Sequence, residues 1–183
     1  MRWIRFKEQA PGYQYHMASN RFIVQLTGGS IIMKDRQSRE ILKRHTGHHY
    51  LYTGDISPDE SECFGLENGK HFYVYSLQTF ELIKRVTLPK CYDSIDMYGH
   101  YSEDGKYIYI PASRWVSDLD HLEFGYYEYV VCKYETERYT LDDKVVVDDW
   151  TKHRWELHKF WDTSAEENSI DPDLEAIMKI ILD

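Results

Sequence analysis

The sequence predicts a mostly β protein made of three four-stranded antiparallel units followed by a C-terminal helical tail. Three observations favour this fold class. Short runs rich in Tyr, Val and Ile alternate with turns of Gly, Pro, Asn and Asp, a segment of about 40 residues recurs, and helical periodicity is confined to the C-terminal end. The 183 residues suffice for a folded core, and the hydrophobic content of 42% argues against intrinsic disorder.

An internal repeat appears when residues 20–44 are aligned with residues 61–85, an offset of 41 without a gap. In this alignment residues 41–44 (ILKR) match residues 82–85 (LIKR). Both copies alternate strand-forming runs with polar turns, so we expect the chain to follow the same path in each.

The second copy predicts its strands most clearly. Its first turn contains Pro58, which presets the backbone, and its second contains Asn68-Gly69, which favours a tight hairpin. Four antiparallel strands within about 40 residues are typical of one propeller blade. The expected strands are residues 50–56, 62–66, 71–77 and 81–88.

A third copy begins near Asp93. Residues 102–105 (SEDG) take the place of the turn at residues 57–60, an offset of 45. Further on, residues 131–136 match residues 74–79 at an offset of 57. The difference predicts an insertion of roughly 12 residues, which falls within Pro111 to Gly125.

Residues 47–88 carry short motifs at fixed places: GH at 47–48, DISPD at 55–59 and NG at 68–69. In this combination they resemble a WD-repeat β-propeller blade, and the resemblance extends over about residues 20–147. It implies about three blades that form an incomplete ring and present binding loops. The Trp-Asp dipeptide of the family is replaced by residues 35–36 (DR), 76–77 (SL) and 133–134 (KY), so the family's His–Ser/Thr–Trp hydrogen-bond network is incomplete.

The chain therefore divides into a partial propeller, residues 1–147, and an aromatic C-terminal segment, residues 148–183. Three blades are fewer than the four that usually close a propeller. We expect the C-terminal segment to pack on the blades or on a second copy of the chain in a homodimer; a protomer of a larger ring is the alternative. The segment carries Trp150, Trp155, Phe160 and Trp161, and then a short amphipathic helix that begins at Asp171-Pro172.

Composition narrows the class of partner. The net charge of −9 opposes binding to nucleic acid and suits a basic protein. No apolar run approaches the roughly 20 residues of a membrane span. Three widely spaced cysteines without a Cys-x-x-Cys pair fit free thiols in a reducing compartment, so we expect a cytoplasmic protein with no nucleic-acid or membrane partner.

No catalytic motif is found. The sequence lacks a nucleophile elbow, a phosphate-binding glycine loop and a zinc-protease motif, so we predict no enzyme activity, no catalytic residue, no metal ligand and no cofactor. His45, His48 and His49 form the densest group of potential ligands. They support an alternative hypothesis, a metal- or small-molecule-binding enzyme with its site at the blade tips, although the WD resemblance implies a structural role for His48.

The insertion in the third copy is the predicted partner-binding surface, because loops that interrupt a repeat often bind and aromatic residues among charges are typical of interfaces. The alternative is a long hairpin that packs on its own blade. The leading hypothesis is a non-catalytic module that binds a basic protein, in its narrowest form a bacterial immunity protein or antitoxin that neutralises a toxin domain. The predicted binding residues are Trp115, Asp118, Asp120, Glu123, Phe124, Tyr126 and Tyr127.

Overall fold

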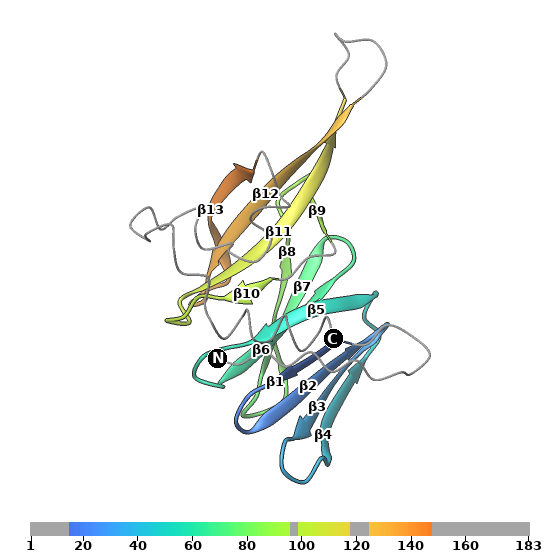
Figure 1. Cartoon of the computed structure of the whole chain (residues 1–183), viewed down its shortest axis with the longest axis vertical. Helices are drawn as coiled ribbons and strands as arrows, with labels where there is room; N and C mark the ends of the chain where they lie inside the picture. The colour runs from blue at the N-terminus through green and yellow to red at the C-terminus, as the bar shows by residue number, and fades with distance from the viewer. Residues whose placement is uncertain (1–14, 96–98, 118–124, 148–183) are drawn as a thin grey trace, which may run out of the picture.

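The computed structural model describes residues 15–95, 99–117 and 125–147. These residues form three antiparallel sheets and contain no helix (Figure 1). The mostly β prediction is therefore confirmed. The predicted aromatic segment and its helix, residues 148–183, lie outside the described residues.

The three sheets follow one another along the chain. In the first sheet the order is β1 (Tyr15–Ala18), β2 (Phe22–Thr27), β3 (Ser30–Asp35) and β4 (Ile41–Thr46). The second has the order β5 (Leu51–Ile56), β6 (Glu62–Glu67), β7 (His71–Ser76) and β8 (Leu82–Thr87). The third has the order β10 (His100–Tyr101), β11 (Tyr107–Val116), β12 (Tyr126–Glu135) and β13 (Thr140–Val147), with β9 (Asp93–Ser94) also paired to β11.

The third sheet differs from the prediction, because it has five strands where four were expected. β10 pairs with the start of β11 at Ile108 and Tyr109, and β9 pairs further along the same edge at Ala112 and Ser113. The edge of β11 is long enough for both, since β11 has 10 residues and its counterpart β6 has 6.

The repeat is visible in the backbone. Arg39, Phe80 and Tyr139 each have a positive φ, between 56° and 65°, and each precedes the outermost strand of its sheet. Non-glycine residues adopt this conformation only where a turn requires it. The spacing from Arg39 to Phe80 is 41, as predicted, but that from Phe80 to Tyr139 is 59. The predicted offset of 57 for the end of the third copy is wrong by two residues.

Serine side chains organise the first turn of each sheet. The Ser57 hydroxyl accepts a hydrogen bond from the Glu62 backbone N–H at 3.0 Å, and the Ser102 hydroxyl accepts one from Tyr107 at 3.0 Å. Ser19 accepts from Phe22, also at 3.0 Å. Such local bonds set the turn independently of the rest of the fold, which explains why the turns could be predicted from the sequence.

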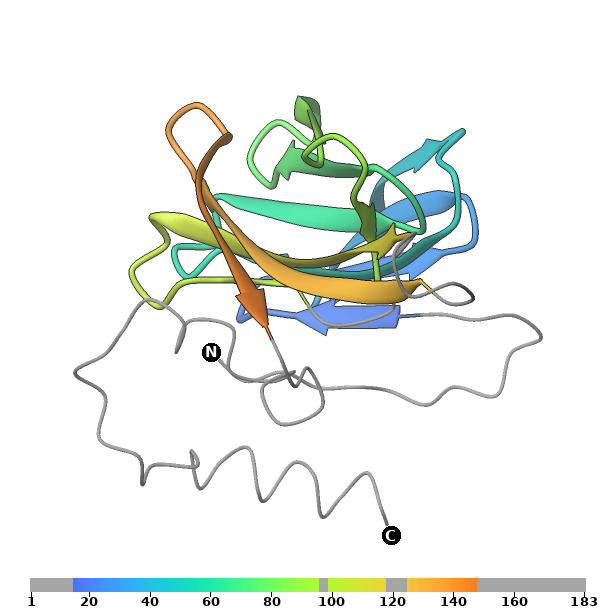
Figure 2. The ribbon, with the colours of Figure 1, turned by 90° about the horizontal axis from the view of Figure 1, so that it is seen from above.

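The second sheet lies between the other two and buries both of its faces (Figures 1 and 2). Strand side chains point alternately to opposite faces. Accordingly, Phe64 and Phe72 pack toward the third sheet, whereas Cys63 and Tyr75 pack toward the first. This alternation produces two continuous apolar layers, one on either side of the second sheet.

The buried carboxyl group of Asp55 connects the second sheet to the third. Asp55 is 3% exposed, and its Oδ2 accepts a hydrogen bond from the Tyr101 backbone N–H at 2.8 Å. Its Oδ1 accepts from the Ile56 N–H at 2.5 Å. Burial raises the pKa of the Asp55 carboxyl well above its usual range, although these two hydrogen bonds oppose the shift.

Two tyrosines in the layer between the second and third sheets differ in their hydrogen bonding. The Tyr101 hydroxyl donates to Glu62 Oε1 at 2.9 Å, whereas the buried Tyr134 hydroxyl has no partner among the described residues. We expect Tyr134→Phe to leave the free energy of unfolding unchanged or raise it by about 1 kcal/mol, and Tyr101→Phe to lower it by about 1–2 kcal/mol. Urea denaturation of both variants measures this, and equal losses would contradict the unsatisfied state of Tyr134.

Candidate functional site

The hairpin formed by β11 and β12 extends beyond the neighbouring sheets (Figure 1). Each of its strands has 10 residues, against 6 in the equivalent β6 and β7. Part of the predicted insertion, Pro111 to Gly125, is therefore strand: residues 111–116 continue β11, and β12 begins at Tyr126, directly after it. These strands form a long hairpin, which is one part of the alternative interpretation; the other part, packing of the insertion on its own blade, stays a prediction.

Large aromatic side chains gather at the end of this hairpin. Trp115 is 55% exposed, Tyr126 55% and Tyr127 56%. Trp115 lies directly opposite Tyr127 in the ladder, and their rings meet edge to face with centroids 5.1 Å apart. Tyr129 continues the aromatic row, 6.3 Å from Tyr127. We call Trp115, Tyr126 and Tyr127 the hairpin tip.

Gly125, which directly precedes β12, leaves space for the Trp115 ring. A Cβ at Gly125 would lie 2.4 Å from the Val116 carbonyl oxygen and 2.5 Å from two atoms of the Trp115 indole. Neither distance is compatible with van der Waals contact, so only glycine fits beneath the ring without a rearrangement.

We expect Gly125→Ala to displace the Trp115 ring while leaving the three sheets folded, because the Cβ conflicts only with the end of the hairpin. Near-ultraviolet circular dichroism should lose signal from the Trp115–Tyr127 pair, with far-ultraviolet strand content unchanged. Gly28→Ala is the control, since a Cβ there meets Tyr50 at an ordinary 3.5 Å. An unaltered near-ultraviolet spectrum for Gly125→Ala would contradict this packing.

A charged cluster supports the hairpin on the other face of its strands. Arg114 Nε donates to Glu128 Oε1 at 2.8 Å, and the Tyr92 hydroxyl donates to the same carboxylate. Arg114 and Lys144 both lie against the Tyr92 ring, at 5.2 and 4.3 Å from its centroid. The hydrogen bonds from Arg114 and Tyr92 lower the pKa of Glu128. Sequence reasoning missed this cluster, because its members are far apart in the chain.

Of the predicted binding residues, the structure pairs Trp115 with Tyr127 on one face of the hairpin and places the exposed Tyr126 next to Tyr127 in the chain, on the opposite face. The other four, Asp118, Asp120, Glu123 and Phe124, lie outside the described residues.

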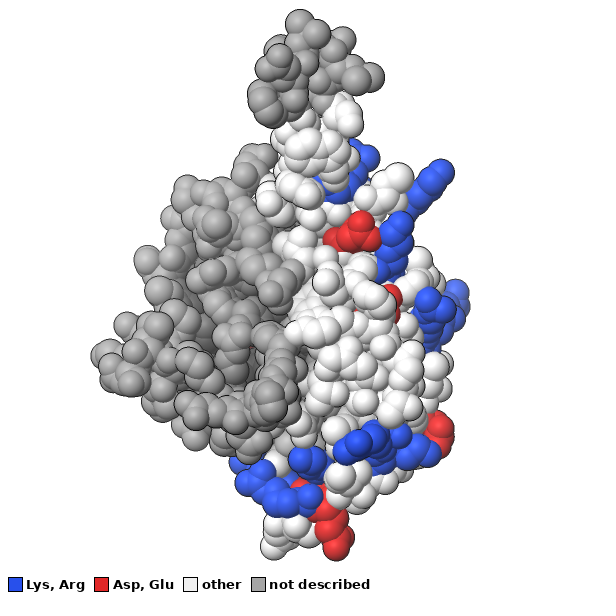
Figure 3. Space-filling view, turned by 90° about the vertical axis from the view of Figure 1, so that its right-hand side faces the viewer, with Lys and Arg blue, Asp and Glu red and all other residues white. Residues whose placement is uncertain are grey.

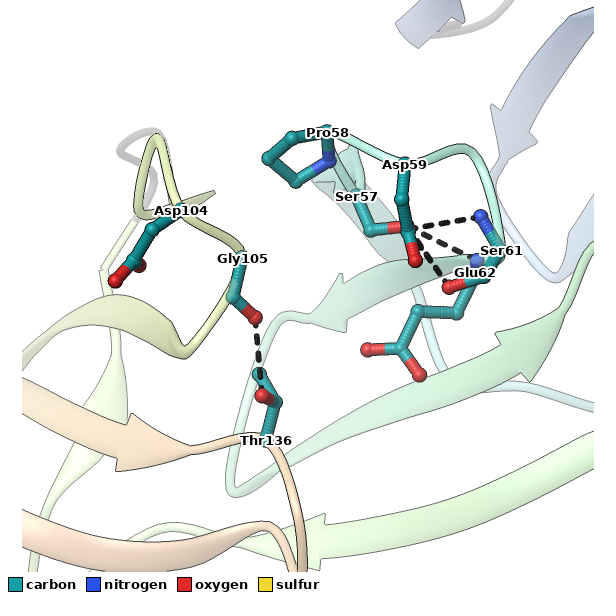
Figure 4. Close-up of a pocket in the computed structure, with 8 residues that line it drawn as sticks. All are labelled: Ser57, Pro58, Asp59, Ser61, Glu62, Asp104, Gly105 and Thr136. Carbon is teal, nitrogen blue, oxygen red and sulfur yellow. Dashed lines mark hydrogen bonds between the residues drawn. The ribbon is translucent and has the colours of Figure 1, made fainter.

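A hollow of about 220 Å³ lies between the turns that join β5 to β6 and β10 to β11 (Figure 4). Inside it the Glu62 carboxylate accepts hydrogen bonds from the hydroxyls of Tyr101, at 2.9 Å, and Tyr139, at 2.5 Å. Burial raises the pKa of Glu62, while the two tyrosines oppose the shift. The Asp104 carboxylate instead points away toward its own turn, where hydrogen bonds from Ser102 and Lys106 lower its pKa to about 2.

The hollow and the hairpin tip are separate surfaces. The hollow adjoins the first residue of β11, and the tip adjoins the last. Ten strand residues span roughly 30 Å, so a small ligand cannot contact both.

His45, His48 and His49, which support the alternative hypothesis of a metal- or small-molecule-binding enzyme, each hydrogen-bond to a different residue. His45 Nε2 hydrogen-bonds the Phe80 carbonyl oxygen at 2.7 Å, and His48 Nε2 hydrogen-bonds the Tyr75 hydroxyl at 2.8 Å. His49 Nδ1 contacts the Asn68 carbonyl oxygen at 3.2 Å. Burial, and then the nearby His45, lower the pKa of His48. Within the described part of the chain, no three His, Cys, Asp or Glu residues are grouped so that they could hold a metal ion.

Charge is distributed unevenly along the chain. The described residues carry 15 Lys and Arg and 16 Asp and Glu, a net charge of −1, whereas the whole chain has −9. One side of the described region even shows more basic than acidic residues (Figure 3). Among the basic residues of the region are those of the outermost strands β4 and β8: Lys43, Arg44, Lys84 and Arg85. Most of the chain's excess of acidic residues therefore lies outside the described residues.

Known proteins are similar to this chain in fold alone. No family model matches the sequence, and no curated protein matches it. Among solved structures, 548 chains match. One is Kuenenia stuttgartiensis hydrazine synthase, with a TM-score of 0.60 and 15% identity over 79% of this chain. The match covers 38% of that protein's chain, and at this identity it shows a shared arrangement of antiparallel sheets.

None of the described residues belongs to a helix that is long and apolar enough to cross a membrane.

Proposed function

We propose that this protein is a binding module for another protein and that the hairpin tip is its contact surface. The observation that carries this proposal is the exposure of Trp115, Tyr126 and Tyr127, each by more than half, on a hairpin that extends past the other sheets. Exposed aromatic groups of this size are unusual on a surface that contacts only water.

The physical properties of the tip suit binding. Trp and Tyr are enriched among the residues that dominate interface energies, because they bury a large area and lose little conformational freedom. The edge-to-face contact of Trp115 with Tyr127 holds both rings in place before a partner arrives. A preorganised pair reduces the entropy lost on association.

We propose a basic protein as the partner. The support is the sequence of the segment that joins β11 to β12, which carries Asp118, Asp120 and Glu123. Acidic groups beside an aromatic contact favour a cationic partner and accelerate its association. The narrower role of an immunity protein or antitoxin is one form of this proposal; a neighbouring gene that encodes a basic toxin domain would support it.

We also propose that the three sheets are WD-repeat-like propeller blades. The support is the recurrence of the same turn geometry before each outermost strand, at Arg39, Phe80 and Tyr139. Propellers present loops from a rigid frame, which is the role proposed here for the hairpin.

Affinity capture from the native cells, with wild type and Trp115→Ala as baits, tests the proposed function. A captured basic protein is then purified and titrated by calorimetry. We expect Trp115→Ala to weaken its binding by about 30-fold or more, the loss typical of an interface hot spot.

The matched control is Ile83→Ala on β8, because Ile83 is 44% exposed but belongs to the second sheet and not to the hairpin. It should bind like wild type. Capture that is independent of Trp115, or a partner that is acidic, would contradict the proposal. Replacing Asp118, Asp120 and Glu123 by the corresponding amides should mainly slow association and reduce its dependence on salt.

A further inference from the structure

An apolar surface lies on the outer face of the third sheet, which faces away from the second sheet. We call it the end face. Its centre is buried: Val131 is 0% exposed, Val147 5% and Tyr109 6%. Partly buried Tyr107, Tyr129 and Ile95 pack around them.

The second sheet does not account for this burial. The second sheet packs on the opposite face of the third, against Ile110, Val130 and Tyr134. Every described member of the end-face cluster belongs to the third sheet or, in the case of Ile95, directly follows β9. On an uncovered sheet face large side chains remain exposed, as Trp115 and Tyr127 are at the far end of this same face. The centre of the end face is thus buried although no other described sheet lies on it, whereas its far end, at Trp115 and Tyr127, is exposed.

We propose that the end face is a docking surface for residues 148–161 of this chain. Strand β13 ends at Val147, whose side chain belongs to the end face, so the chain reaches the surface at that point. The next fourteen residues can extend over roughly 45 Å, more than the width of four strands at about 4.8 Å each. They contain Trp150, Trp155, Phe160 and Trp161, which match an apolar, tyrosine-rich face in character.

This inference is independent of the proposed function. Because Trp115 and Tyr127 are exposed on the same face, docking of residues 148–161 leaves the hairpin tip available to another protein. The docked segment thus takes the place that a fourth blade would occupy in a larger ring.

Photo-crosslinking in the full chain tests the inference. Benzoylphenylalanine replaces Tyr129, a partly buried member of the end face, and adducts formed on illumination are mapped by mass spectrometry. We expect intramolecular adducts within residues 148–161. The control places the same group at Ile83, which is exposed on the second sheet and should form no adduct with that segment.

Other adducts at position 129 would overturn the inference. Adducts confined to residues 1–14 would assign the face to the N-terminal segment, and adducts between two chains would assign it to a second copy. A lack of adducts would mean that nothing covers the face. Trp155→Ser provides a second readout in the full chain, because it should reduce the yield of adducts at position 129 by about tenfold while Trp155→Phe retains it.

Discussion

Replacing Asp55 with Ala is expected to lower the free energy of unfolding by about 2–5 kcal/mol. The carboxylate is 3% exposed and accepts hydrogen bonds from two backbone N–H groups, those of Ile56 and Tyr101. Alanine leaves both donors buried without an acceptor, and each unsatisfied group costs about 1–3 kcal/mol. Because Tyr101 belongs to β10, the loss also weakens the connection between the second and third sheets.

Guanidinium denaturation of wild type, Asp55→Ala and Asp55→Asn measures the effect. Asparagine keeps one acceptor and should fall between the other two. Asp59→Ala is the control, because Asp59 lies in the next turn and its hydrogen bonds are with Ser57 and Ser61 within that turn. Losses of equal size at positions 55 and 59 would contradict a special role for Asp55.

The same residue predicts a dependence on pH. Burial raises the pKa of Asp55 well above its usual range, so in the folded protein the group stays protonated at a pH where it is ionised in the unfolded chain. The folded state then binds more protons. From about pH 4 up to the folded pKa, the stability of wild type relative to Asp55→Asn should fall as the pH rises. A rise over this window would show that the carboxyl is ionised in the folded protein.

Gly54→Ala should be equally damaging, with a loss of about 3–5 kcal/mol or failure to fold. A Cβ at Gly54 would lie 2.0 Å from the Phe64 carbonyl oxygen on the neighbouring strand. Backbone atoms in a ladder cannot move aside as a side chain can, so β5 and β6 would have to separate. The buried Phe64 ring, which packs edge to face on Phe72 and Tyr101, would move with them.

Gly65 provides a matched control, because it is the direct ladder partner of Gly54. The three atoms nearest to a Cβ at Gly65 are side-chain methyl groups of Leu26, Leu51 and Ile31, at 3.4–3.8 Å. We expect Gly65→Ala to change the free energy of unfolding by less than about 1.5 kcal/mol. The melting temperatures of Gly54→Ala and Gly65→Ala measure this difference. A melting temperature of Gly54→Ala close to that of wild type would contradict the close approach of the two strands.

Much of the second sheet could be predicted from the sequence, because its signals are local. The four strands expected at residues 50–56, 62–66, 71–77 and 81–88 agree with β5 to β8 to within about one residue at each end. Alternating side chains and serine- or glycine-containing turns act over a few residues, so they can be identified before any tertiary contact is known.

In the third copy, the local sequence patterns did not predict the strand ends correctly. Matching residues 131–136 to residues 74–79 by their chemistry produced an offset of 57, whereas the positive φ of Phe80 and Tyr139 defines an offset of 59. The inserted residues are more numerous than expected, because they lengthen both strands of the hairpin as well as the loop between them. Side-chain similarity cannot locate the end of a strand pair whose length is set by cross-strand pairing.

The candidate binding surface was predictable in part. The aromatic character of Trp115, Tyr126 and Tyr127 is evident in the sequence, and so is their place in a segment that interrupts the repeat. That Trp115 faces Tyr127, and that Gly125 lies beneath its ring, depends on the register of β11 against β12. Register is a property of the folded hairpin, so it followed only from the structure.

By itself, then, the sequence determined the class of the protein: three β units with their turns, an aromatic insertion and an acidic balance. Only the tertiary structure showed that Asp55 bonds the Tyr101 backbone, 46 residues away, and that Glu62 binds Tyr139, 77 residues away. The physical reason is the range of the interactions: turn and strand preferences arise between neighbours in the chain, whereas buried hydrogen bonds arise between residues that folding brings together.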